Sequence, residues 1–141
     1  MHRFLLLLIL SIPFSGISAQ TKVEKWRIFE IVLNGESKEN PFTDVKLGAV
    51  FTNGETTKTV TGFYDGKGIF KIRFMPQETG AWTYVTSSNL KVLHNKKGKF
   101  DCVSNTKNNH GPVIVNDTFN FAYSDGKPYY PFLVQKLACL N

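Results

Sequence analysis

The sequence has 141 residues, of which 42% are hydrophobic and 20% are charged. A chain of this length can form one domain with a substantial core but not two, and its composition excludes disorder throughout. The formal net charge of +6 comes partly from a lysine-rich segment, residues 91–99, that flanks a predicted hairpin tip. Because the chain has no arginine cluster and no nucleic-acid motif, we interpret these lysines as solvated loop charge and predict no nucleic-acid partner.

Residues 1–19 have the layout of a secretory signal peptide. Arg3 precedes a short apolar run, 4–12, and the small residue Ala19 stands at the expected cleavage site. The apolar run is too short to span a bilayer as a helix. We therefore expect a secreted or periplasmic protein with no membrane contact after cleavage. An uncleaved N-terminal anchor is the alternative.

Beyond the signal peptide, apolar residues alternate with polar ones, which is the period of β-strands. In the segment 69–75, for example, Phe70, Ile72 and Phe74 share one face. The first segment, 25–33, is apolar on both faces, which predicts one strand that is partly covered on both sides. The predicted strands are, in chain order, 25–33, 44–52, 57–64, 69–75, 81–87, 99–103, 112–116 and 119–124.

The gaps between these segments carry turn residues, such as Asn53-Gly54 and Asp65-Gly66. After the signal peptide, no segment of ten or more residues has helical periodicity. Many short strands separated by turns predict an all-β fold, an immunoglobulin-like antiparallel β-sandwich. The spacing of Cys102 and of the other candidate ligands fits no metal site, so we expect no metal and no cofactor, and we interpret Cys102 as a buried free thiol rather than a disulfide partner of Cys139.

Three roles are open for the aromatic-rich stretch 62–88. Catalysis would need paired carboxylates, but turn geometry explains both Asp65 and Glu78, so we predict no catalytic residue. Sugar binding would use exposed aromatic rings with polar neighbours, and Tyr64 beside Asp65 has this character. Trp82 could also stack on a sugar, but the face that it shares with other apolar residues favours a place in the core. The third role is docking against another domain.

The chain resembles a known family over residues 23–132. The blocks that carry the resemblance are, in order, FYDG, IRFMP, GAWTY, TSSN, NHGPV and FAYSDGKPYYPF. Each block is a weak signal by itself, but their order is specific. They are similar to the N-terminal β-sandwich domain of unknown function that precedes the (β/α)8 catalytic barrel of bacterial apiosidase-like glycoside hydrolases.

The resemblance implies a domain plan and a partner. The sandwich would occupy residues 20–104, and residues 105–132 would form a linker and a hairpin leading toward a catalytic barrel absent from this chain. His110, Tyr129 and Tyr130 would then lie at the interdomain interface. The catalytic carboxylates would lie on the barrel, so the chain would be non-catalytic. Residues 133–141 diverge from the family, as a frameshift or a truncation would produce.

Two other functions fit the same residues. An independent carbohydrate-binding module would bind polysaccharide through an exposed row of aromatic rings that includes Tyr64. A stand-alone immunoglobulin-like adhesion or structural domain would bind a protein and no sugar.

Overall fold

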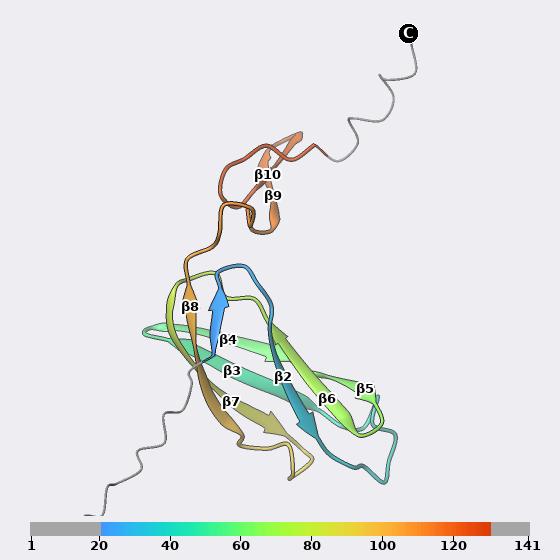
Figure 1. The fold of residues 1–141 in the computed structure, drawn as a ribbon. Helices are drawn as coiled ribbons and strands as arrows, with labels where there is room; N and C mark the ends of the chain where they lie inside the picture. The colour runs from blue at the N-terminus through green and yellow to red at the C-terminus, as the bar shows by residue number, and fades with distance from the viewer. Residues whose placement is uncertain (1–20, 131–141) are drawn as a thin grey trace, which may run out of the picture.

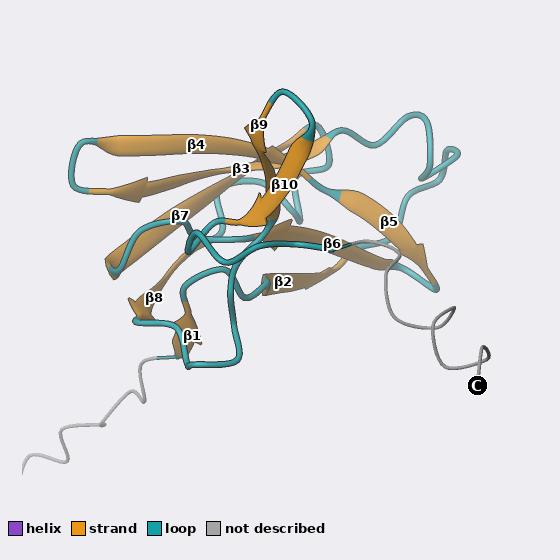
Figure 2. Ribbon diagram, turned by 90° about the horizontal axis from the view of Figure 1, so that it is seen from above, coloured by secondary structure: helices purple, strands orange, loops and turns teal. Residues whose placement is uncertain are grey.

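The computed structural model describes residues 21–130. The predicted signal peptide, the divergent tail and Cys139 lie outside the described residues. Within them the chain forms a five-stranded sheet, a three-stranded sheet and a two-stranded sheet, and no helix. The two larger sheets lie as two layers (Figures 1 and 2), and the two-stranded sheet stands beyond one end of them (Figure 1). The predicted all-β sandwich is confirmed.

The five-stranded sheet has the order β1-β8-β7-β3-β4 and the three-stranded sheet the order β2-β6-β5. The β1–β8 pair is parallel, and all other pairs are antiparallel. The small sheet is a hairpin of β9 and β10. The bounds of the strands are β1 Lys22–Glu24, β2 Phe29–Asn34, β3 Leu47–Asn53, β4 Thr56–Thr61, β5 Phe63–Gly66, β6 Ile69–Phe74, β7 Gly80–Ser88, β8 Lys97–Val103, β9 Val113–Asp117 and β10 Asn120–Tyr123.

Aromatic rings from both layers fill the space between the sheets. Phe51 of β3 stacks on Phe74 of β6 with ring centroids 4.2 Å apart. Phe29 of β2 stacks on Phe100 of β8 at 4.0 Å. Trp82 is 1% exposed, which confirms its predicted place in the core. The phenylalanines that the alternation places inward therefore interdigitate across the sandwich, as close packing requires.

The predicted strand 25–33 is wrong, because the chain changes sheets within it. β1 ends at Glu24 in the five-stranded sheet, and β2 begins at Phe29 in the three-stranded sheet. Between them Trp26 adopts a positive φ of 66°, and its amide donates to the Pro76 carbonyl. The predicted cover on both faces is also missing, since Val32 is 53% exposed.

The predicted strand 57–64 is likewise two strands. Gly62 separates β4 of the five-stranded sheet from β5 of the three-stranded sheet. A Cβ at Gly62 would lie 2.7 Å from the Leu47 side chain and 2.8 Å from that of Ile72. Only glycine lets the chain pass so close to the core as it crosses between layers.

Other predictions hold. Cys102 is buried and its thiol is free. Burial raises the pKa of this thiol, and the nearby charge of Lys25 opposes the shift only in part. The lysines of the segment 91–99 are exposed on the turn between β7 and β8 and on the start of β8.

Candidate functional site

The two residues predicted to bind sugar lie next to each other in β5 but face different surroundings. The Tyr64 ring is half-buried, 4.9 Å from the ring of Phe70, and its hydroxyl accepts a hydrogen bond from the Gly68 amide. Asp65 pairs with Lys71 at 2.5 Å. The structure therefore does not bring Tyr64 and Asp65 together on one surface. Sugar binding by this pair stays a prediction.

Asp65 belongs to an open cluster of charges on the outer face of the three-stranded sheet. Its hydrogen bond raises the pKa of the Lys71 ammonium, with help from the charges of Asp65 and Glu30. Arg73 donates to Glu30 at 2.7 Å and lies 5.1 Å from the ring centroid of Phe63. The two carboxylates are thus occupied by cations on an exposed surface. They are therefore not a pair of carboxyl groups left free to act on a bound substrate, as hydrolysis requires.

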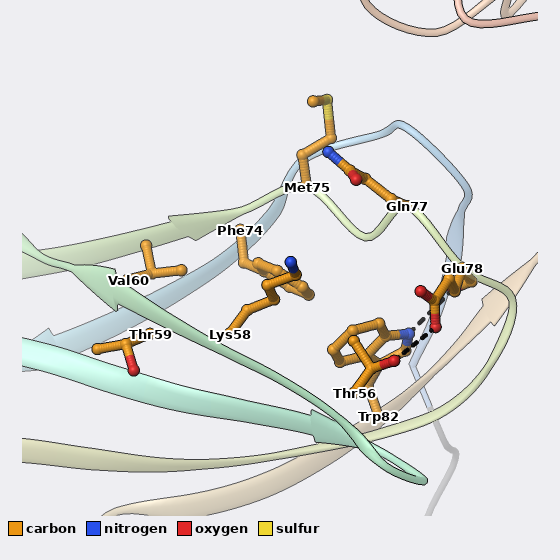
Figure 3. A pocket seen from close by; sticks show the side chains of 9 residues that line it. All are labelled: Thr56, Lys58, Thr59, Val60, Phe74, Met75, Gln77, Glu78 and Trp82. Carbon is orange, nitrogen blue, oxygen red and sulfur yellow. Dashed lines mark hydrogen bonds between the residues drawn. The ribbon is translucent and has the colours of Figure 1, made fainter.

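A pocket of about 260 Å³ opens between β4 and the β6–β7 connection (Figure 3). Its inner end is formed by Phe74 and Trp82, whose indole nitrogen donates to the Glu78 carbonyl at 3.0 Å. Glu78 is the one carboxylate among the lining residues, and it accepts a hydrogen bond from Thr56. Because general acid and base roles in glycoside hydrolysis take two carboxyl groups, this pocket lacks the residues for that reaction.

His110 lies in a polar junction between the linker and the turn after β10. Its Nδ1 is 2.7 Å from an Asp125 oxygen, and its ring packs against Tyr123. Burial raises the pKa of the Asp125 carboxyl, but hydrogen bonds from the Lys127 amide and from His110, with the charges of both residues, outweigh it and lower the pKa overall. His110 and Asp125 therefore hold the turn after β10 in place by bonding to each other.

The linker before the hairpin is fastened to the sandwich. The Asn109 side chain donates to the Lys25 carbonyl at 2.9 Å. Gly111 has a φ of 78°, and a Cβ there would lie 2.6 Å from the Trp26 ring. The exceptional backbone at Trp26 thus turns its indole against the linker, which sets where the hairpin begins.

The hairpin itself is apolar and open to solvent. Every residue of β9 is exposed, Val115 by 68%, and Phe121 of β10 is 48% exposed. A hollow of about 410 Å³ between β10 and the following chain is lined by Tyr129 and by Tyr130, which is 70% exposed. Of the predicted interface residues, Tyr130 is exposed while Tyr129 and His110 are half-buried.

Sequence reasoning missed the most exposed ring of this hairpin, Phe119, which is 89% exposed in the turn between β9 and β10. The alternation of Phe119, Phe121 and Tyr123 was the available signal, but it indicated a strand face and not what covers it. Within residues 21–130, no helix is long and apolar enough to cross a membrane. In the same range, no three acidic, histidine or cysteine side chains gather closely enough to hold a metal ion.

Residues 22–89 match the family described as "Domain of unknown function (DUF5060)". The chain is also similar to a solved structure of a putative glycoside hydrolase from Bacteroides vulgatus ATCC 8482, with a TM-score of 0.76 and 47% sequence identity. The similarity covers 79% of this chain and only 22% of that protein. No curated protein matches the chain. This chain thus corresponds to a small part of a much longer relative.

Proposed function

We propose that the chain is the non-catalytic accessory part of a secreted glycoside hydrolase and that it packs on a catalytic (β/α)8 barrel. Two findings support the proposal. The 47% identical relative is a putative glycoside hydrolase, of which this chain covers 22%. None of the carboxylates described above forms the paired arrangement in a pocket that hydrolysis needs.

The observation that carries the docking role is the exposed hairpin. A two-stranded sheet with apolar side chains on both faces is only marginally stable in water, and β9 is exposed along its whole length. Exposed apolar patches of this kind are typical of protein interfaces. We therefore assign the hairpin, with Tyr130, as the surface that the barrel covers. The layout of residues 1–19 supports export to the periplasm or the medium.

A chimera tests this role. The segment of the Bacteroides vulgatus protein that matches this chain is replaced by the corresponding residues of the chain, and Val115→Asp is compared with Val32→Asp. Both valines lie in strands, and they are 68% and 53% exposed. If the rest of the protein covers the hairpin, Val115→Asp lowers the melting temperature of the chimera and Val32→Asp does not.

The same two variants in this chain alone provide the control, and there both should leave the melting temperature unchanged. Equal effects of the two variants in the chimera would refute the docking surface. A chimera without either substitution that does not fold would refute it as well. The chain alone should release no sugar from glycosides or polysaccharides, and measurable turnover would refute the non-catalytic role.

A further inference from the structure

The outer face of the five-stranded sheet carries an open groove of about 730 Å³. Its floor is Gly48 of β3, which pairs with Thr61 of β4 on one side and with Ser87 of β7 on the other. Residues directly opposite in antiparallel strands share a face. The glycine therefore forms a gap between two hydroxyl-bearing side chains, and Thr59 extends the hydroxyl row along β4.

Three hydroxyl groups of this groove are free to bind. Among the described residues, the side-chain hydroxyls of Thr59, Thr61 and Ser87 have no hydrogen-bond partner. A Cβ at Gly48 would approach just one atom within 4 Å, the Val60 carbonyl oxygen at 3.2 Å. The groove is therefore open above its floor, and a ligand could reach hydroxyls on both sides of it.

An exposed aromatic ring stands at the rim. Phe42 is 71% exposed, although exposing a whole phenyl ring costs free energy. The ring is not loosely attached, because Tyr64 contacts it edge-on at 4.9 Å and the Asn40 side chain accepts from the Phe42 amide. A ring held outward in this way can stack on the C–H face of a pyranose.

The turn that carries Phe42 is fastened to β7. The Asn89 side chain accepts from the Lys46 amide at 2.8 Å and donates to the Asp44 carbonyl at 2.7 Å. Both hydrogen bonds join the rim to the strand that supplies Ser87. The ring and the hydroxyls are thus parts of one preformed surface, as binding sites with low ordering cost require.

The charge of the groove selects the class of sugar. Lys46 is the one charged residue that lines it, and no carboxylate lines it. The nearby Asp44 carboxylate is used inside its own turn, where it accepts from the Asn40 amide and the Thr43 hydroxyl. Within residues 21–130, the Lys46 ammonium has no acidic partner. A cation without a counter-ion beside free hydroxyls complements a ligand that carries both hydroxyls and a carboxylate.

We propose that this groove binds a uronate-bearing glycan. Phe42 stacks on a sugar ring, Thr59, Thr61 and Ser87 hydrogen-bond to its hydroxyls, and Lys46 pairs with a carboxylate. Tyr64 then acts beneath Phe42 as a support instead of contacting the sugar. The groove lies on the sandwich and not on the hairpin, so this proposal does not depend on docking to a barrel.

The test is calorimetric titration of the full chain with hexagalacturonate and with its methyl ester, which keeps the sugar ring and removes the charge. We expect the acid to bind more tightly than the ester, and we expect the affinity for the acid to fall as salt is added. Phe42→Ala should lower the affinity for both ligands about tenfold. Lys46→Gln should abolish the preference for the acid and leave ester binding unchanged. Gly48→Val, which fills the floor without a positive φ, should abolish binding of both.

Matched variants elsewhere serve as controls. Phe63→Ala removes a 39% exposed ring from the other sheet, and Lys107→Gln removes an exposed lysine from the linker. Neither should change affinity, and circular dichroism should show every variant folded. No binding of either ligand, or equal losses for Phe42→Ala and Phe63→Ala, would overturn the site. If the ester binds more tightly than the acid and Lys46→Gln does not change this, the assignment of an anionic ligand is overturned.

Discussion

Substituting Gly111 with alanine should release the hairpin from the sandwich without unfolding the sandwich. Two costs add at this position. Its φ of 78° is unfavourable for alanine by about 1–2 kcal/mol. The new Cβ would also lie 2.6 Å from the Trp26 ring, far inside the normal carbon–carbon contact of about 3.5–4 Å. Such overpacking costs a further ~1–3 kcal/mol, which is relieved when the linker moves away from the ring.

The matched control is Gly126→Ala. Gly126 has a similar φ of 88°, but a Cβ there would meet no other atom within 4 Å. That variant therefore carries the backbone strain alone and should act only on its own turn. Hydrogen–deuterium exchange of residues 105–112 is the assay. Gly111→Ala should accelerate exchange there by about 30-fold or more, since each 1.4 kcal/mol is a factor of ten. Gly126→Ala should leave exchange in these residues unchanged.

A double-mutant cycle separates the two costs. In a Trp26→Ala background, Gly111→Ala no longer meets the indole, so its effect should shrink to the backbone strain of about 1–2 kcal/mol. The melting temperature of the sandwich should be the same in all of these variants because none of Gly111, Gly126 and Trp26 belongs to the buried core. If Gly111→Ala has the same effect with and without Trp26, the indole does not position the linker and the reasoning fails.

Two further predictions concern single side chains. Thr86→Val should lower the free energy of unfolding by about 2 kcal/mol in chemical denaturation, because the buried Thr86 hydroxyl donates to the Leu93 carbonyl and accepts from the Lys96 amide. Thr57→Val, at an exposed position, should change the free energy of unfolding by less than about 0.5 kcal/mol. Equal effects of the two variants would contradict a role for the two hydrogen bonds. Asp125→Asn should speed hydrogen exchange of the Lys127 amide at neutral pH, because this amide donates to the Asp125 carboxylate. The pKa of Asp125 is lowered in the folded protein, so the carboxylate stabilises the turn fully above the unfolded pKa of about 3.9 and loses this effect as the pH falls through the folded pKa. The two proteins should exchange alike near pH 2, and a difference that persists there would show another cause.

The strands themselves were predictable because alternation is a local property of the sequence. In β6 the inward residues Phe70, Ile72 and Phe74 are all buried, as their two-residue spacing indicates. The changes of sheet at Trp26 and Gly62 were not predicted. At each of them the alternation continues across the break, and a side-chain period cannot tell which of two sheets a strand joins. The isolated Gly62 inside a strand pattern was the one signal that could have indicated the crossing.

The candidate sites depend on contacts between distant residues, and this limited their prediction. His110 and Asp125 are 15 residues apart and meet only because the hairpin folds back on the linker. Asn89 joins the turn near Phe42 across more than 40 residues. No local pattern shows that Phe42 is 71% exposed while Tyr64 is half-buried beside it, because both depend on contacts between distant residues.

The apolar character of the hairpin is not explained by the folding of this chain. The core of the sandwich contains eleven buried residues that contact one another, and none of them belongs to β9 or β10. Within the hairpin strands, Ala122 alone is buried. Most of the Val115 side chain and about half of Phe121 stay in water in the isolated chain, and covering this remaining surface with a partner would contribute on the order of 1 kcal/mol for each. Apolar surface that stays in water within the described residues is best explained by a partner that covers it, which is the role that we propose for the catalytic barrel.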